Sequence, residues 1–298
     1  MKFSFLRNFK PTVKEALEEL ISFFSQNKIS EPKTDAQLLM AKALGTTRSK
    51  LPLFWTAPVS SALLKAIEDF CARRIRREPV QHIIGEWSFL DLQLFVGREA
   101  LIPRPETEEW VEKLCRVISN ETPFQDRTIF FADICTGTGA VGLSLAFKTP
   151  RSIGFLSDVS EPALKLAQKN LGRYPELKNR VNLVYSDLLS CFKTRSIDFI
   201  AGNPPYIPTS EVLKLAPDVR DFEPKIAIDG GENGLFYFSR ILDESSRVLK
   251  PGGILALEHG YDQQDAILRL PAPHLAVFEL GKDFCGKDRY IFWRHQNR

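Results

Sequence analysis

The sequence predicts an α/β protein in which a small all-helical domain precedes a parallel, doubly wound sheet. Beyond Thr128, short apolar runs alternate with segments of helical periodicity, which is typical of such sheets. Residues 1–78 show helix caps and helical periodicity but no strand pattern. The chain has 298 residues, which is long enough for two domains with separate cores.

Composition narrows the class of protein. With 44% hydrophobic and 26% charged residues the chain is typical of a globular protein, and its net charge of +3 does not demand a nucleic-acid partner. The basic cluster Arg73–Arg77 is interpreted as a solvated helix face. The five cysteines form no C-x-x-C pair and the four histidines are scattered, so we expect no metal site and a cytoplasmic location. No apolar run reaches the length of a membrane span.

Helix-start signals mark the N-terminal domain. Thr12 with Glu15 forms a capping box before an apolar stretch of helical spacing, and Thr34 with Gln37 repeats the pattern. A third helix is expected to begin near Ser60 or Ser61. These features predict a packed helical domain that carries no chemistry of its own.

A different pattern separates this domain from the sheet. Residues 86–96 alternate as in a β-hairpin, and residues 101–105 form an extended strip. Pro105 suits the first position of a helix with an acidic first turn. We therefore divide the chain into a helical domain at 1–78, a hairpin linker at 79–105 and a sheet domain at 106–298.

Polar residues follow the predicted strands of the sheet domain. The strands are expected at 128–134, 153–156, 181–185, 197–201 and 254–257, with helices up to 147 and at 162–171 and 235–249. Asp133, Asp158, Asp187 and Asn203 stand at or near four strand ends. Because ligands of doubly wound sheets bind outside the carboxyl ends of the strands, these residues predict one shared cleft.

The tetrapeptide Asn203-Pro204-Pro205-Tyr206 is the most informative motif. Two successive prolines remove two backbone donors and end the strand in a stiff loop. The Asn203 side-chain oxygen and the Pro204 carbonyl could then accept the two hydrogens of a planar –NH2 group, while the Tyr206 ring covers its face. The alternative is a proline turn that only caps a strand.

The glycine turn leaves two cofactors to compare. Gly137–Gly142 matches G-x-G-x-x-G after a strand, and Asp158 stands near the position of a ribose-binding acid, so an NAD-dependent oxidoreductase is one alternative. Asp133 before the glycines would repel a pyrophosphate, and Asp187 suits an adenine edge. The tetrapeptide has no role in hydride transfer. S-adenosylmethionine, which has a sulfonium and no phosphate, therefore fits better.

Several motifs together resemble those of the bacterial release-factor glutamine N5-methyltransferases. They are Glu78–Gly85, Leu101–Glu108, Asp133–Gly139, Asn203–Tyr206, Asp221–Pro224 and Leu255–Gly260. The similarity runs from about Asp35 to Asp288, most of the chain. The Asn-Pro-Pro-Tyr motif is shared with adenine-N6 DNA methyltransferases, whereas the Leu101–Glu108 strip is much more specific.

The resemblance implies a Rossmann-like class I S-adenosylmethionine-dependent methyltransferase domain with a reversed last strand, and an N-terminal domain that docks the substrate. The implied reaction methylates the side-chain amide of the glutamine in the Gly-Gly-Gln tip of class I peptide-chain release factors. The residues expected to bind substrate and act in catalysis are Asn203, Pro204, Pro205 and Tyr206. Those expected to bind the cofactor are Asp133, Cys135, Thr136, Gly137, Thr138, Gly139, Asp158, Asp187, Leu188 and Asn203.

Two positions depart from the family pattern. Cys135 stands where relatives usually have glycine, and Leu188 replaces a common aromatic residue, so we expect both to affect cofactor affinity.

Two other functions stay open. An adenine-N6 methyltransferase would need a target-reading domain and a broad basic face, and neither is evident, so no nucleic-acid partner is expected. An inactive S-adenosylmethionine-binding scaffold would not need the intact tetrapeptide.

Overall fold

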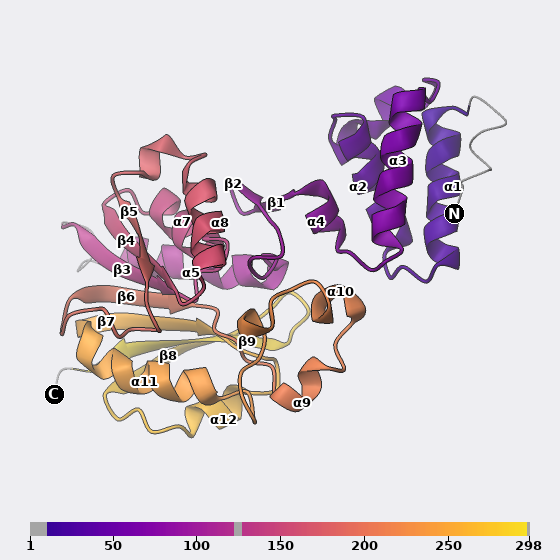
Figure 1. Cartoon of the computed structure of the whole chain (residues 1–298). Helices are drawn as coiled ribbons and strands as arrows, with labels where there is room; N and C mark the ends of the chain where they lie inside the picture. The colour runs from indigo at the N-terminus through magenta and orange to yellow at the C-terminus, as the bar shows by residue number, and fades with distance from the viewer. Residues whose placement is uncertain (1–10, 122–126, 297–298) are drawn as a thin grey trace. The chain divides into compact units, whose positions relative to one another are not determined.

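The computed structural model describes residues 11–121 and 127–296. By their contacts these residues form two compact units (Figure 1). The helical unit ends at Gly85 and also includes Pro217–Phe222, whereas the sheet unit comprises Glu86–Ala216 and the chain from Glu223. The contact boundary thus falls between Gly85 and Glu86, so the predicted hairpin groups with the sheet.

Helix caps shape the helical unit. Its elements are α1 (Val13–Gln26), α2 (Pro32–Ala43), the 3-10 helix η2 (Arg48–Phe54), α3 (Ser61–Arg74), α4 (Val80–Ile84) and α10 (Pro217–Arg220). The capping box of Thr12 and Glu15 is present, as predicted, and α3 begins at Ser61, at its predicted start, with Ser60 as its cap. The second predicted box is wrong, because α2 already begins at Pro32 and Thr34 therefore lies inside the helix.

The basic cluster Arg73–Arg77 is partly internal. Arg74 is buried and pairs with Asp35 at 2.6 Å and with Asp218 at 2.8 Å. Arg77 donates to two backbone carbonyls beyond the end of α1. The interpretation as a solvated face is therefore wrong for Arg74, because a buried guanidinium needs carboxylate partners and the fold supplies two.

The buried amide of Asn170 is one of the groups that anchor the hairpin within the sheet unit. Strands β1 (Glu86–Phe89) and β2 (Leu92–Phe95) pair antiparallel, as predicted. The Asn170 side chain accepts from the Phe95 N–H at 2.7 Å and donates to the carbonyls of Phe95 and Thr138 at 3.1 and 2.9 Å. This amide therefore links the hairpin to the glycine turn.

A seven-stranded sheet organises the larger unit, with strand order β5-β4-β3-β6-β7-β9-β8. In chain order its elements are α5 (Pro105–Asn120), β3 (Ile129–Ile134), α7 (Ala140–Lys148), β4 (Ser152–Asp158), α8 (Glu161–Leu171), η3 (Pro175–Leu177), β5 (Val181–Tyr185), β6 (Ile197–Gly202), α9 (Thr209–Val212), η4 (Lys225–Ala227), α11 (Phe236–Val248), β7 (Leu249–Glu258), α12 (Gln264–Leu268), β8 (Leu275–Lys282) and β9 (Asp288–His295). Strands β3 to β7 are parallel, and β9 runs antiparallel between β7 and β8. The predicted doubly wound sheet with a reversed last strand is confirmed.

Alternating side chains of the central strands form two cores. Phe131 and Phe199 stack on each other and pack with α5 and α7, whereas Ala132 and Ile200 pack with α11 on the opposite face. Figure 1 shows α5 and α7 over one face of the sheet and α11 and α12 over the other. This burial of both faces explains why the strands read as continuous apolar runs.

Strand β7 differs from its prediction at its start. It begins at Leu249 rather than Ile254, and its register with β6 shifts between Ile197 and Phe199. Gly252 has a φ of +75°. The Pro251-Gly252-Gly253 sequence therefore forms an irregular part of the strand, which glycine permits because it adopts positive φ without a Cβ clash.

Candidate active site

The loop between β3 and α7 is stabilised from within. Asp133 is 1% exposed, and its Oδ2 accepts hydrogen bonds from the Thr136 hydroxyl at 2.5 Å and the Gly142 N–H at 2.9 Å. A Cβ at Gly142 would overlap the Leu156 side chain, so only glycine fits there. Burial raises the pKa of Asp133 to about 7. Asp133 therefore shapes the turn from beneath.

Asp158 lies at the end of β4, where its carboxylate holds the next turn. Its Oδ2 accepts from the Gly137 N–H and its Oδ1 from the Ser160 N–H, both at 2.9 Å. Burial raises the pKa of this carboxyl above its ordinary value. Each oxygen keeps a further lone pair, so the carboxylate can still accept hydrogen bonds from a ligand.

Cys135 and Leu188 both have left-handed backbones, with φ of +55° and +47°. A residue with a Cβ adopts this conformation at a cost of about 1–2 kcal/mol. Burial raises the pKa of the Cys135 thiol well above its ordinary value, so the group stays protonated. Both side chains line the pocket described below, where they contribute packing.

Asp187 follows β5 but already has a protein partner. Its carboxylate receives two hydrogen bonds from Arg240, at 3.1 and 2.8 Å, and its side chain is 52% exposed. Arg240 also pairs with Glu244, whose Oε2 accepts from the Leu189 N–H at 3.1 Å. The predicted contact between Asp187 and an adenine edge therefore competes with an ion pair.

The acceptor loop, Asn203–Tyr206, continues directly from β6. Asn203 is half-buried, and its Nδ2 lies 3.4 Å from the Thr107 hydroxyl oxygen. Tyr206 donates from its hydroxyl to Glu258 Oε1 at 3.4 Å, and burial raises the pKa of that hydroxyl. The two ends of the loop are thus held by side chains from α5 and β7.

Close backbone contacts hold the rest of the acceptor loop. The Gln263 amide donates to the Tyr206 carbonyl at 2.8 Å, and its oxygen accepts from the Gly260 N–H at 3.0 Å. A Cβ at Gly230 would lie 2.7 Å from the Tyr206 Cα, and one at Gly234 would overlap the Tyr206 carbonyl oxygen. Only glycine fits at these two positions, so the loop has little freedom to shift.

Glu258 is a buried carboxylate beneath the acceptor loop. It is 1% exposed, and its Oε2 accepts from the Thr107 hydroxyl at 2.6 Å and the Trp110 indole N–H at 2.8 Å. Burial raises its pKa above the ordinary value. The network connects the first helical turns of α5 to the end of β7.

A second ion pair supports the pocket wall. Arg104 Nη2 lies 2.8 Å from both carboxylate oxygens of Glu223, which is almost fully buried. The Ile102 N–H also bonds to this carboxylate, although burial still raises its pKa. The pair connects Arg104 of the Leu101–Glu108 strip to Glu223 of the Asp221–Pro224 motif, and both motifs contribute residues to the pocket wall.

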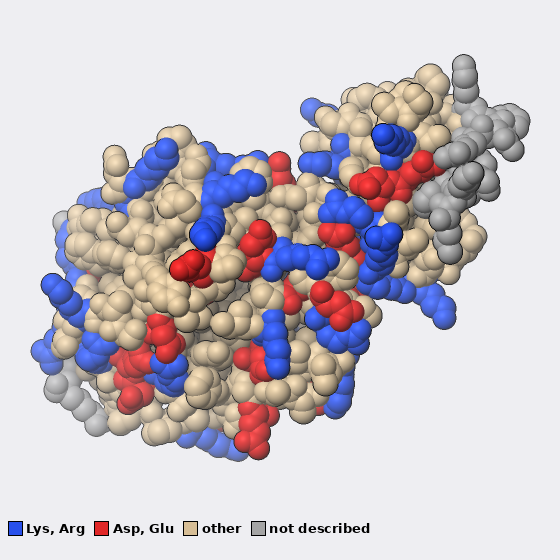
Figure 2. Space-filling view, in the orientation of Figure 1, with Lys and Arg blue, Asp and Glu red and all other residues tan. Residues whose placement is uncertain are grey.

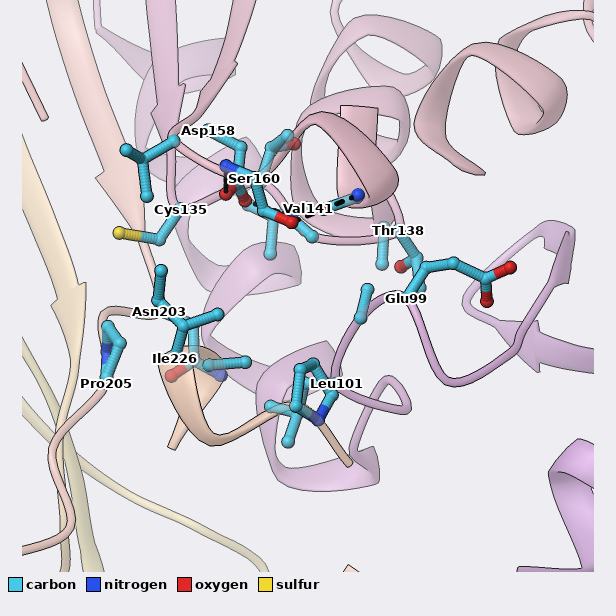
Figure 3. Close-up of a pocket in the computed structure, with 18 of the residues that line it drawn as sticks. Glu99, Leu101, Cys135, Thr138, Val141, Asp158, Ser160, Asn203, Pro205 and Ile226 are labelled. Carbon is cyan, nitrogen blue, oxygen red and sulfur yellow. Dashed lines mark hydrogen bonds between the residues drawn. The ribbon is translucent and has the colours of Figure 1, made fainter. Parts of the chain in front are cut away.

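These elements enclose one pocket of about 950 Å³, open solvent included. Figure 3 shows Asp158 and Ser160 on one side of it and Asn203 and Pro205 on another, with Cys135 between them. Its charged lining consists of three carboxylates and one guanidinium. Arg240 pairs Asp187 and Glu223 pairs Arg104, so among the described residues Glu99 and Asp158 are the lining carboxylates without such an ion pair. The pocket is therefore suited to a cationic ligand more than to a phosphate.

Most of the predicted site residues meet in this pocket. The lining includes Cys135, Thr136, Gly137, Thr138, Asp158, Asp187, Leu188, Asn203 and Pro205. Asp133, Gly139, Pro204 and Tyr206 lie outside it, and their predicted ligand contacts stay predictions.

Sequence reasoning gave no role to Arg104, Thr107, Glu223 or Glu258. These residues lie within recognised motifs, but their side-chain partners at the site are 96 or more residues away in the chain, except that Glu258 and Tyr206 are 52 residues apart. No spacing rule predicts such contacts.

Among curated proteins, relatives match nearly the whole chain. The release factor glutamine methyltransferase of Caulobacter vibrioides is 36% identical over 88% of this chain and 89% of its own length. The chain belongs to the release factor glutamine methyltransferase family. The enzyme of that name from Moorella thermoacetica is 34% identical over 96% of this chain and 99% of its own length. The resemblance read from the sequence motifs is therefore confirmed.

Domain matches and a solved structure agree with this family. Residues 15–85 match the PrmC N-terminal domain, and residues 114–216 match the methyltransferase small domain. The crystal structure of a methyltransferase from Pyrococcus furiosus matches 71% of this chain over 92% of its own chain, with 20% identity and a TM-score of 0.50. This match shows that the two proteins share a fold. The chain is thus a methyltransferase with a class I fold.

Neither a metal cluster nor a membrane helix occurs in the part of the chain that the structure describes. Within residues 11–121 and 127–296, no group of three or more histidine, cysteine or acidic side chains is arranged to hold a metal ion. In the same residues, no helix is both long and apolar enough to cross a membrane.

Proposed function

We propose that this release factor glutamine methyltransferase transfers a methyl group from S-adenosylmethionine to the side-chain amide nitrogen of the glutamine in the Gly-Gly-Gln tip of class I release factors. The names of its relatives support the protein substrate. The observation that carries the chemistry is Asn203, which lines the pocket with its NH2 directed at Thr107. Its side-chain oxygen is thereby left for an amide hydrogen of the substrate.

S-adenosylmethionine fits the lining of the pocket. When bound, it supplies a methyl group on a sulfonium, whose C–S electron pair stays on sulfur as the methyl leaves. Asp158 would accept from the ribose hydroxyls, and the turn around Gly137 would lie against the methionine part. The unpaired charges of the lining are negative, which favours a sulfonium and an ammonium and disfavours the pyrophosphate of NAD.

The acceptor loop has to activate a poor nucleophile. The lone pair of a carboxamide nitrogen is delocalised into the carbonyl, which makes the nitrogen a weak nucleophile. The rate therefore depends on how well the lone pair is aligned with the methyl group. Asn203 Oδ1 accepts one N–H of the substrate and the Pro204 carbonyl accepts the other. Alignment of reacting groups supplies about 7–11 kcal/mol in favourable cases. As the N–C bond forms, the nitrogen becomes acidic and releases one proton to water.

The contacts of Tyr206 lie outside the pocket lining, and its stacking on the substrate amide stays a prediction. Its hydroxyl bonds to Glu258 and its ring packs with the core on the α11 face. Tyr206 thereby anchors the end of the acceptor loop, so Tyr206→Phe is expected to weaken the anchor while the pocket surface stays the same.

One assay tests the proposal directly. Purified protein is incubated with a class I release factor and methyl-labelled S-adenosylmethionine, and the modified residue is mapped by mass spectrometry. We expect one methyl group on the glutamine of the Gly-Gly-Gln motif, and labelling about 10²–10³-fold slower when Asn203→Ala replaces the wild-type protein. Labelling of another residue, or of an adenine in a DNA duplex added as a competitor, would contradict the proposal.

The charge distribution agrees with a protein substrate. Figure 2 shows lysine and arginine side chains interspersed with aspartate and glutamate over the visible face, without a broad basic area. Nucleic-acid substrates call for such an area because phosphate contacts supply much of their affinity. This observation does not favour the adenine-N6 alternative.

We also propose that the helical unit docks the release factor. The unit has a core of its own, formed by residues such as Phe24 and Met40, but none of its described residues belongs to the pocket lining. We therefore expect KM to be at least about tenfold lower for a folded release factor than for a Gly-Gly-Gln peptide, since contacts away from the reacting group add affinity. Equal KM values would leave the unit with a stabilising role only.

A further inference from the structure

Thr107 lies between the proposed acceptor residue and a buried carboxylate. It is 4% exposed in the first turns of α5, and its hydroxyl oxygen is 2.6 Å from Glu258 Oε2 and 3.4 Å from Asn203 Nδ2. Thr107 comes from the Leu101–Glu108 motif and Glu258 from the Leu255–Gly260 motif. Their contacts bring three distant parts of the chain, separated by 96 and 151 residues, to one point.

The hydrogen-bond directions in this chain of contacts are determined by chemistry. A carboxylate oxygen only accepts, and Glu258 Oε2 also accepts from the Trp110 indole, which can only donate. Thr107 must therefore donate its single hydroxyl hydrogen to Glu258, which leaves its oxygen with lone pairs alone. The part of the Asn203 amide that faces Thr107 must then be its NH2 and not its carbonyl oxygen.

We propose that Thr107 and Glu258 are positioning residues that determine which way the Asn203 amide points. An asparagine amide has two orientations related by a 180° rotation, and only one presents its oxygen to the pocket. Asn203 Oδ1 receives no hydrogen bond from the described residues, so it stays available to a substrate N–H. This inference rests on the proposed function, because the orientation matters only if that oxygen accepts from the substrate.

The same carboxylate also holds the other end of the acceptor loop. Tyr206 donates to Glu258 Oε1 at 3.4 Å, whereas the Thr107 and Trp110 bonds use Oε2. Each oxygen of Glu258 therefore supports one end of the acceptor loop. Because the group accepts every bond, its hydrogen-bonding capacity matters here more than its charge.

Substitutions at Thr107 separate orientation from packing. Thr107→Val keeps the shape of the side chain but removes the hydroxyl, so we expect kcat to fall about tenfold or more, with the Kd of S-adenosylhomocysteine changed by less than about threefold. Thr107→Ser keeps the hydroxyl and should retain kcat within about threefold. A kcat for Thr107→Val within threefold of wild type, or an equal loss in Thr107→Ser, would overturn the inference.

Thr149→Val is the matched control. Thr149 is also a buried threonine whose hydroxyl is bonded, to the Leu145 carbonyl at the end of α7, but it lies outside the pocket. We expect this variant to lower the melting temperature while kcat stays at the wild-type value. If Thr149→Val lowers kcat as much as Thr107→Val does, the effect reports general destabilisation and the orientation role is refuted.

Glu258 variants distinguish hydrogen bonding from charge. In Glu258→Gln the amide oxygen can accept from Thr107 and Trp110, while the NH2 faces the Tyr206 hydroxyl. We therefore expect Glu258→Gln to retain more than a third of kcat and Glu258→Met to lose at least as much as Thr107→Val, within about threefold. Equal losses in both Glu258 variants would show that the charge is needed and would overturn the orientation role of this carboxylate.

A measurement without substrate tests the orientation of the Asn203 amide independently of the proposed function. In protein labelled with ¹⁵N-asparagine, the side-chain NH2 signal of Asn203 is identified by its absence in Asn203→Ala. Thr107→Val should move this signal, and Thr149→Val should not. A signal unmoved by Thr107→Val would refute the orientation role, whereas a moved signal with no release-factor methylation by the wild-type protein would refute only the proposed function.

Discussion

The cofactor side and the acceptor side of the pocket are built in different ways. In the glycine turn, hydrogen bonds donated to the carboxylates of Asp133 and Asp158 join residues 3, 9 and 21 positions apart. At the acceptor loop, Asn203 and its supports are joined by contacts that span 52 to 151 residues. The cofactor side is thus a local structure of one strand–turn–helix unit and its neighbour, whereas the acceptor side depends on the whole sheet unit.

This difference leads us to expect separable functions. Changes on the acceptor side should reduce turnover and leave cofactor affinity intact, and changes on the cofactor side should do the reverse. Substitutions at Asn203 and Asp158 test that separation, and substitutions at Asp133 and Cys135 then test how the cofactor side is stabilised, from the largest expected effect to the smallest.

Asn203→Ala should lower kcat by about 10²–10³, because it removes one preorganised polar group at the reacting atom. Initial rates of methyl transfer to a release factor measure this effect, and calorimetry with S-adenosylhomocysteine should find nearly unchanged affinity. Asn203→Asp should also be harmful, since a carboxylate has no NH2 to donate to Thr107. If cofactor affinity falls together with kcat, the two sides of the pocket are not separable.

Asp158→Ala should weaken S-adenosylhomocysteine binding by about 10–100-fold, the expected loss for one or two hydrogen bonds to a charged group. Calorimetry measures the affinity. Asp187→Ala provides a matched carboxylate control whose oxygens are already engaged by Arg240, and we expect a smaller loss from it. Binding of NAD in place of S-adenosylhomocysteine would contradict the assignment of the cofactor.

Asp133→Asn should change how stability depends on pH. The pKa of Asp133 is raised to about 7 in the folded protein, so its contribution is fully present below pH 4 and is lost as pH rises toward 7. The free energy of unfolding of the wild type should fall relative to that of the variant by at least about 1 kcal/mol over this range. Urea titrations at several pH values measure it, and parallel curves for the two proteins would argue against a buried, titrating Asp133.

Cys135→Gly should have the smallest effect, and unlike the substitutions above it should be favourable because it should raise the stability of the protein. It relieves a left-handed backbone at a φ of +55°, worth about 1–2 kcal/mol, but glycine loses about 0.5–1 kcal/mol of conformational entropy. We expect a net gain of about 0.5 kcal/mol in stability, seen as a small rise in melting temperature, with kcat unchanged. A fall in stability would mean that the packing of the thiol outweighs the backbone strain.

The success of the sequence-based predictions follows the same division. The hairpin, the parallel sheet and the cap at Thr12 depend on periodicity and short spacings, and the structure confirms them. The second capping box at Thr34 failed because Pro32 provides an earlier helix start. Arg74 was misjudged because its partners Asp35 and Asp218 are distant in the sequence.

In the pocket, too, the sequence predicted which strand ends meet but not which side chains from other elements contact them. The sequence predicted that Asp158 and Asn203 share a cleft, because the carboxyl ends of parallel strands meet at one edge of a sheet. It also suggested that Asp187 is free for the cofactor, whereas the structure pairs this carboxylate with Arg240 from α11. Which side chains approach from another helix depends on packing, and packing leaves no periodic signal.

By itself the sequence determined the order of strands and helices, the family, the glycine turn and the acceptor tetrapeptide, since each depends on residues close together in the chain. Only the tertiary structure decided how the Asn203 amide is oriented. Thr107 and Glu258 reach it across 96 and 151 residues because α5 and β7 pack against each other beneath the acceptor loop. A buried hydrogen bond has a direction, and that direction is set only when all of its partners are in place.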